Sequence, residues 1–78
     1  MKVKRYFESM RVRPDRAGIR IEWIQAVITD PEREVTQADG RIRRWRLVPE
    51  AEGRHLRVVL LADGETVHNA FFDRGYKP

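Results

Sequence analysis

The chain has 78 residues and a formal net charge of +4, with 36% charged and 41% apolar residues. This length and composition predict one domain, residues 1–78, and exclude disordered and fibrous proteins, while the absence of cysteine excludes disulfides and thiolate sites. No segment approaches the ~20 apolar residues of a membrane span, and the charged first residues differ from a signal peptide, so we expect a cytoplasmic protein.

The first predicted elements are a strand and a helical turn. Loose alternation of apolar and charged residues favours a strand over residues 2–10. In residues 13–18, Pro14 suits the first turn of a helix and Gly18 suits its end. We therefore expect a short helical turn between this strand and the main helix.

The main helix is predicted over residues 19–29. Its apolar side chains recur at helical spacing, and the helix should end at Asp30 because the residue before Pro31 is driven out of the α region. We expect this apolar stripe to pack against a sheet. The stripe comprises Ile21, Ile24, Val27 and Ile28.

Four strands are predicted in the rest of the chain. They span residues 32–37, 41–48, 54–61 and 65–72. Asp39-Gly40 and Asp63-Gly64 are typical hairpin turns between them. The predicted fold class is therefore α+β: a four- to five-stranded antiparallel sheet with a C-terminal β-meander, and one main helix and a short helical turn packed on one face.

The turn at Asp63-Gly64 predicts the register of the last hairpin. Toward the helix we expect the pairs Leu60–Val67, Val58–Asn69 and Leu56–Phe71, which makes Asn69 a buried amide. On the other face we expect His68 opposite Val59 and Arg57 opposite Ala70. The strand over residues 41–48 alternates poorly, so a bulge is expected there; without one, Trp45 lies opposite Arg57.

His68 and Arg57 are candidates for chemistry on the face away from the helix. An imidazole there could transfer a proton at neutral pH, although a surface histidine bonded to a neighbour or to water is the alternative. An arginine on a central strand is costly unless it is paired, which favours contact with an anion. An ion pair with Asp73 or Glu34 is the alternative explanation of Arg57.

Arg74 and Tyr76 follow the last strand. They could supply a cation beside a phosphate and a group that stacks or transfers a proton; the alternative is a turn that tucks the tail. A second candidate region is a basic strand with one aromatic residue, which suits single-stranded RNA, although a core position for the tryptophan is the alternative. This region comprises Arg41, Arg43, Arg44, Trp45 and Arg46.

No cofactor or metal site is predicted. The sequence has no His-Glu-x-x-His motif, no glycine-rich phosphate loop and no Gly-x-Ser-x-Gly elbow. Most of the 16 basic residues are arginine, which suits bidentate contacts with phosphate. The basic stretches over residues 2–20 and 41–57 make RNA a candidate partner, and an arginine-biased, solvated surface is the alternative.

The order of these elements, together with four stretches of sequence, resembles a small uncharacterised bacterial family allied to the BrnT and RelE/ParE toxins. The stretches are Arg16-Ala17-Gly18-Ile19, residues 37–43, residues 56–59 and residues 64–74. The resemblance implies a protein that cleaves RNA without a metal and is silenced by an antitoxin-like partner. It also implies catalytic positions for His68, Arg57, Arg74 and Tyr76.

These observations lead to two hypotheses of different classes. The first is a toxin-like, metal-independent ribonuclease or RNA-binding module. The second is a non-catalytic module that forms a homodimer or binds another protein through the sheet face that carries Val59 and Leu61.

Overall fold

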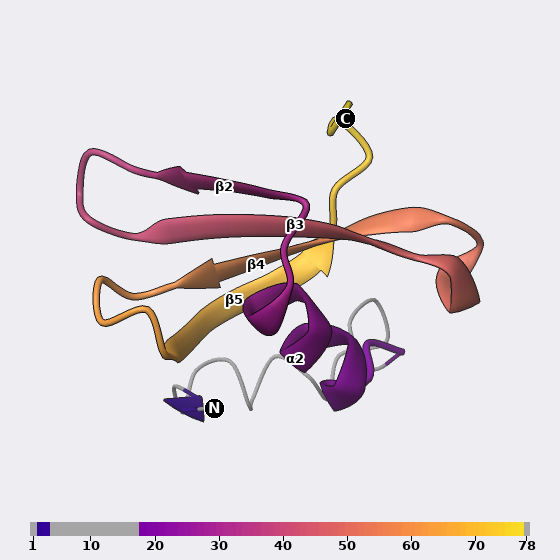
Figure 1. The fold of residues 1–78 in the computed structure, drawn as a ribbon, viewed down its shortest axis with the longest axis horizontal. Coiled ribbons are helices and arrows are strands. Elements are labelled where there is room, and N and C mark those ends of the chain that lie inside the picture. The colour runs from indigo at the N-terminus through magenta and orange to yellow at the C-terminus, as the bar shows by residue number, and fades with distance from the viewer. Residues whose placement is uncertain (1, 4–17, 78) are drawn as a thin grey trace.

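The fold is known from a computed structural model, which describes residues 2–3 and 18–77. One helix and one sheet make up most of this part, which confirms the α+β class (Figure 1). Most of the predicted helical turn at residues 13–18 and most of the predicted strand at residues 2–10 lie outside the described residues. The elements are β1 (Lys2–Val3), α2 (Ile21–Thr29), β2 (Arg33–Thr36), β3 (Ile42–Val48), a 3-10 helix (Pro49–Ala51), β4 (Arg54–Leu60) and β5 (Thr66–Phe72).

The sheet has the strand order β1-β5-β4-β3-β2, and strands β2 to β5 are antiparallel neighbours. Strand β1 pairs with β5 in parallel, which corrects the prediction of a sheet that is antiparallel throughout. Strands β2, β3, β4 and β5 are joined by short connections, which set antiparallel pairing. No turn joins β1 to β5, so no local sequence signal specifies the direction of that pair.

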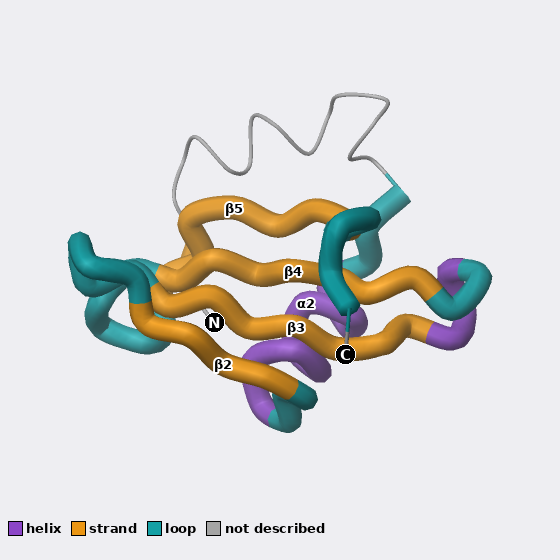
Figure 2. Tube along the Cα trace, turned by 90° about the horizontal axis from the view of Figure 1, so that it is seen from above, coloured by secondary structure: helices purple, strands orange, loops and turns teal. Residues whose placement is uncertain are grey.

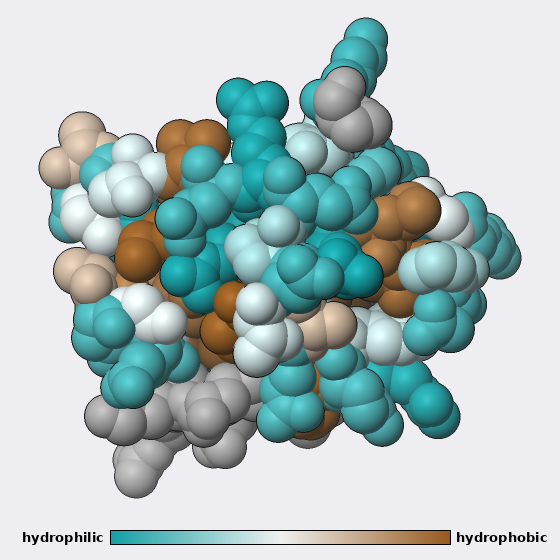
Figure 3. Space-filling model, in the orientation of Figure 1, coloured by the Kyte–Doolittle hydropathy of each residue, from teal (hydrophilic) through white to brown (hydrophobic). Residues whose placement is uncertain are grey.

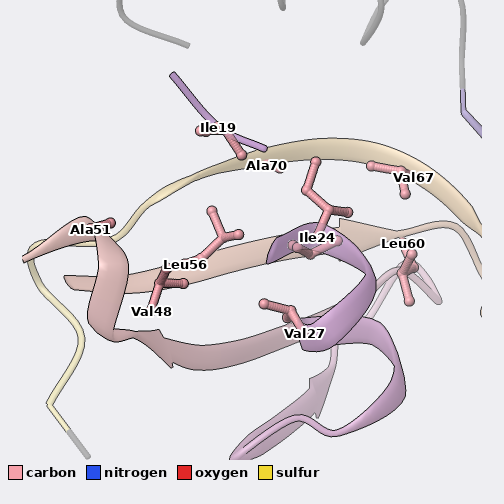
Figure 4. Packing of buried hydrophobic residues seen from close by; sticks show 10 residues of the cluster. Ile19, Ile24, Val27, Val48, Ala51, Leu56, Leu60, Val67 and Ala70 are labelled. Atoms are coloured by element: carbon pink, nitrogen blue, oxygen red, sulfur yellow. The ribbon is translucent and has the colours of Figure 1, made fainter. Parts of the chain in front are cut away.

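Helix α2 packs on one face of the sheet, against β3 and β4 (Figures 1 and 4). It begins two residues later than predicted because Arg20 is extended, and it ends before Asp30 as predicted. Ile24 and Val27 are fully buried, while Ile21 and Ile28 are partly buried against the same core. The strands contribute Val48, Leu56, Val58, Leu60, Val67 and Ala70 to this core.

The register of the last hairpin shifts at a bulge in β5. The predicted pair Leu60–Val67 is confirmed, but beyond it Val58 lies opposite Ala70 and Leu56 opposite Phe72. The reason is that Val67 and Ala70 are both fully buried although they are three residues apart, so one extra residue must fit between them. That residue is His68.

The bulge changes the prediction for Asn69. Asn69 lies opposite Val59 rather than Val58, so its position belongs to the sheet face away from α2. Strand β3, where a bulge was predicted, pairs with β4 without interruption. As a result Trp45 lies opposite Arg57, the pairing expected for a regular strand.

After β5 the chain crosses the sheet on the side opposite α2, passing over β4 and β3 (Figure 2). We call this side of the sheet the open face and residues 73–77 the C-terminal segment. The register places Arg43, Trp45, Arg57, Val59 and Phe71 on the open face.

Candidate functional site

The arginines of β3 divide between the two faces of the sheet, and those on the helix side bind the end of α2. The Nη1 group of Arg44 donates to the carbonyl oxygen of Ile28 (2.9 Å), and its Nε pairs with Glu34 Oε1 (2.6 Å). Arg46 Nη1 donates to the carbonyl oxygen of Asp30 (2.8 Å) and pairs with its carboxylate (3.2 Å). Cations are favourable at the carbonyl end of a helix, so both side chains contribute to the fold.

Arg41 and Arg43 lie on or beside the open face. Arg41 is bound to the hairpin turn, with its Nε 3.8 Å from Asp39 Oδ2 and its backbone N–H donating to Oδ1 of the same residue (3.0 Å). Arg43 lies opposite Val35 on one side and Val59 on the other, and its buried Nε–H has no acceptor in residues 2–3 and 18–77. Within the described part of the chain, no carboxylate pairs with Arg43.

Trp45 is 7% exposed and is the centre of a cluster on the open face. Its indole Nε1–H donates to Asp73 Oδ2 at 3.0 Å. Its ring is stacked on Tyr76, with 5.2 Å between the ring centroids and 16° between the planes. Trp45 is therefore buried by the C-terminal segment rather than by α2.

Arg57 binds the same carboxylate. Its Nη1 lies 3.5 Å from Asp73 Oδ2, which confirms the ion pair given as the alternative explanation of this residue. The guanidinium carbon lies 5.1 Å from the ring centroid of Phe71 and 5.7 Å from that of Trp45, distances at which cation–π attraction operates. The Nε of Arg57 is buried and has no hydrogen-bond partner among the described residues.

The pKa of Asp73 is lowered below its ordinary value. The hydrogen bond from Trp45 is the main cause; the backbone N–H of Gly75 and the charge of Arg57 add to it, and burial opposes it. Asp73 is therefore held as a carboxylate, and this stabilises the contacts that fix the C-terminal segment on the sheet.

A tight turn directs the C-terminal segment back over the sheet. Asp73 Oδ1 accepts a hydrogen bond from the Gly75 N–H (3.0 Å), and the Tyr76 N–H reaches the carbonyl oxygen of Asp73 (3.4 Å). Asp73 itself donates its backbone N–H to the carbonyl oxygen of His55 (2.9 Å). An aspartate that binds the backbone two residues later is a common turn, and this one returns the Tyr76 ring to Trp45 and His55.

The four residues predicted to be catalytic are only partly brought together. Arg57 and Tyr76 both contact the Trp45–Asp73 pair, and Arg74 is exposed in the same segment. His68 is half-buried at the bulge, level with the step between Val59 and Leu60 of β4. That level is about 15 Å along the strand from His55, whose ring contacts Tyr76.

Two members of the cluster, Asp73 and His55, were not predicted as site residues. Asp73 was considered as an ion-pair partner of Arg57 and as part of the alternative turn that tucks the tail, and the structure contains both the ion pair and the turn. His55 has the same parity as Arg57 on β4, so the predicted alternation already placed it on the open face, but only His68 was chosen there as a candidate for chemistry. Its ring is 4.8 Å from that of Tyr76, and its Nε2 lies 3.5 Å from Glu32 Oε1.

The prediction that Val59 and Leu61 are exposed is only partly correct. Leu61 is half-buried and Val59 is only 7% exposed, whereas Val35 and Leu47 are 36% and 38% exposed. In the view of Figure 3, apolar residues form separate spots among polar ones.

A shallow depression of ≈ 280 Å³ lies at the turn of the C-terminal segment. It is lined by Gly53, Arg54, His55, Phe72, Asp73, Arg74 and Tyr76.

Comparison with known proteins found no matching family model, no matching curated protein and no matching solved structure. The resemblance to the toxin families therefore stays a prediction. No helix in the described part of the chain is long and apolar enough to span a membrane. Residues 2–3 and 18–77 also contain no group of three or more His, Cys, Asp or Glu side chains placed to hold a metal ion.

Proposed function

We propose that this protein is a toxin-like RNA-binding module that holds single-stranded RNA on the open face of its sheet. The observation that carries the proposal is the juxtaposition of Arg43 and Arg57 on that face with the aromatic rings of Trp45 and Phe71. Single-stranded RNA is bound by cations that contact phosphates and by rings that stack on bases. The net charge of +4 favours the same class of partner.

The hydrogen bonding of the two arginines supports an anionic ligand. Arg43 and Arg57 occupy diagonal positions on neighbouring strands, and each has a buried Nε–H without an acceptor. A guanidinium group that lacks acceptors is costly to bury, and phosphate oxygens are acceptors that it binds in a bidentate manner. Arg44 and Arg46 already bind the end of α2, so Arg43 is the stronger candidate for RNA contact on β3.

Binding is better supported than cleavage. Cleavage without a metal needs one group to take the proton of the 2′-hydroxyl, one to protonate the leaving oxygen and a cation beside the phosphate. Arg57 and Tyr76 could act on one phosphate, but the level of His68 is about 8 Å along β4 from Arg57 and about 15 Å from His55, whose ring Tyr76 contacts. A ribonuclease would therefore use His55 or Arg74 with Tyr76.

Fluorescence anisotropy with a labelled single-stranded RNA of about 12 nucleotides tests the proposal, since small single-strand-binding domains cover a site of this order. We expect binding that weakens as salt rises. In the Arg43→Gln variant the log–log salt slope should flatten by about 0.7 if one phosphate contact is lost. Arg20→Gln is the matched control because Arg20 is exposed at the start of α2, on the other side of the sheet.

Three results would contradict RNA binding on the open face. They are absence of binding at low salt, binding that salt does not affect, and equal losses for Arg43→Gln and Arg20→Gln. Equal losses would mean that the overall charge of the protein, and not this face, attracts RNA.

Cleavage is tested on the same RNA in the presence of EDTA, and toxicity by inducible expression in bacteria. Intact RNA and normal growth would limit the function to binding. The protein would also be a ribonuclease if it cuts RNA in EDTA, if Tyr76→Phe and Arg57→Ala abolish the cutting, and if His68→Ala retains it. The active site would then be centred on the C-terminal segment.

A second candidate function is protein binding at the edge of the sheet. Strand β2 is the last strand in the described sheet, all four of its residues are exposed, and Val35 projects from it on the open face. An exposed edge strand can pair with a strand of another chain, here an antitoxin-like protein or a second copy. If the protein is a dimer in sedimentation experiments, Val35→Lys should make it monomeric without weakening RNA binding.

A further inference from the structure

The C-terminal segment places an anionic group and an aromatic ring on the open face. A nucleotide has the same two features, a phosphate and a base. A carboxylate, from Asp73, lies between the Trp45 Nε1–H (3.0 Å) and Arg57 Nη1 (3.5 Å). An aromatic ring, from Tyr76, is stacked at 5.2 Å on the same indole. An anion at the edge of the ring and an aromatic plane on its face are what a phosphate and a base would offer to Trp45 and Arg57.

We propose that Trp45 and Arg57 form a nucleotide subsite for single-stranded RNA, and that Asp73 and Tyr76 occupy this subsite until RNA displaces them. The inference rests on the proposed function and adds the position of one bound nucleotide. Its base stacks on Trp45 in place of Tyr76, and its phosphate binds Arg57 in place of Asp73. The C-terminal segment thus acts as an internal competitor that weakens binding in the resting protein.

The geometry of the segment suits displacement. Arg74, Gly75 and Lys77 are exposed, and of the described residues after Asp73 only Tyr76 is half-buried. The Asp73 backbone stays bonded to His55, and beyond it the segment is held to the open face by the Asp73 carboxylate and the Tyr76 ring. Trp45 and Arg57, in contrast, belong to β3 and β4 inside the sheet. The segment can therefore move while the subsite keeps its form.

If Asp73 competes with RNA, removing its charge should change the affinity for RNA and the salt dependence of binding. A purely structural role for Asp73 does not predict this change. Arg57 has an internal counter-charge in the resting protein, so replacing Asp73 with phosphate releases no ion from solution at this contact. In Asp73→Asn the amide oxygen can still accept the Trp45 hydrogen bond, but Arg57 then holds an ion from solution. RNA binding should consequently become tighter, and its salt slope steeper by about 0.7.

The decisive experiment measures RNA affinity of full-length variants by anisotropy. We expect Tyr76→Ala to bind single-stranded RNA about tenfold more tightly than the wild type, because one competing stack is removed. Lys77→Gln is the matched control, since Lys77 lies in the same segment and is exposed. In a Trp23→Phe background, which leaves Trp45 as the fluorescent tryptophan, the emission should change on addition of RNA.

The outcomes separate this inference from the proposed function. If the wild type binds RNA but Tyr76→Ala binds it equally or less tightly, the competitor role is wrong and RNA binding on the open face stands. The same conclusion follows if Trp45 emission does not respond to RNA. If neither the wild type nor Tyr76→Ala binds RNA, the proposed function is wrong, and the subsite with it.

Discussion

The arginines of β3 have different roles on the two faces of the sheet. On the helix side, Arg44 and Arg46 reach carbonyl oxygens at the end of α2 and acidic side chains beside them, so each contributes to the fold. On the open face, Arg43 and Arg57 have buried Nε–H groups without acceptors. Neighbouring residues of one basic strand thus differ in role because successive side chains of a strand point to opposite faces.

This difference identifies where a ligand can gain most. A cation whose donors are already bound gains little from a phosphate, whereas one whose donors lack acceptors gains a charged hydrogen bond. The open face also carries the aromatic cluster of Trp45 and Tyr76, while the aliphatic core lies under α2. Stability is therefore concentrated on one side of the sheet and the capacity to bind on the other.

The largest expected effect is the loss of stability when an apolar residue on the helix side of the sheet is truncated, compared with one on the open face. Ile24 is fully buried between α2 and the sheet, so Ile24→Ala should lower the free energy of unfolding by ~2–5 kcal/mol. Val35, 36% exposed on the open face, is the control, and Val35→Ala should change the free energy of unfolding by less than about 0.5 kcal/mol. Urea denaturation measures both values. An Ile24→Ala variant as stable as the wild type would refute the packing of α2 on the sheet.

A second prediction compares adjacent arginines on the two faces. Arg44→Met should lower the free energy of unfolding by about 1–3 kcal/mol, because the carbonyl oxygen of Ile28 and the carboxylate of Glu34 both lose their donor. Arg43→Met should be neutral or stabilising, since methionine keeps much of the apolar stem and removes an Nε–H without an acceptor. Equal losses for the two variants, measured by urea denaturation, would mean that Arg43 is as well bonded as Arg44.

The sequence predicted the helix and the larger strands because each has a local signal. The apolar stripe of α2 is nearly continuous and ends at Asp30-Pro31, and Asp63-Gly64 correctly predicted the pair Leu60–Val67 next to the turn of the last hairpin. The bulge at His68 was missed because strict alternation was assumed along the whole strand. The signal was present, since Val67 and Ala70 are apolar residues three apart, a spacing that a regular strand cannot bury on one face.

The candidate site was harder to predict because it depends on contacts between distant parts of the chain. Trp45 and Asp73 are 28 residues apart, and no periodicity relates them. The sequence identified Arg57, Trp45 and Tyr76 individually but could not show that one carboxylate joins two of them. Likewise, strand alternation predicts that Arg43 and Arg44 lie on opposite faces of the sheet. Only the position of α2 shows that Arg44 is the one bonded to the helix.

The smallest expected effect concerns the acid that joins the C-terminal segment to the open face. The pKa of Asp73 is lowered in the folded protein, chiefly by the hydrogen bond from Trp45, relative to an unfolded value of about 3.9. A lowered folded pKa means that the carboxylate stabilises the fold at pH values above the unfolded pKa. That contribution is lost as pH falls through the folded pKa, because the unfolded chain takes up the proton first.

Asp73→Asn should therefore be less stable than the wild type near neutral pH, and the gap should narrow as the solution is acidified below about pH 4. Urea denaturation of both proteins between about pH 7 and about pH 3 measures this gap. Asp39→Asn is the control, because Asp39 is 53% exposed on a hairpin away from the Trp45 cluster and solvent screens its charge. A gap that is independent of pH, or that widens in acid, would show that the charge of Asp73 does not hold the C-terminal segment on the sheet. In that case only the hydrogen bond and the Tyr76 stack would remain to hold it.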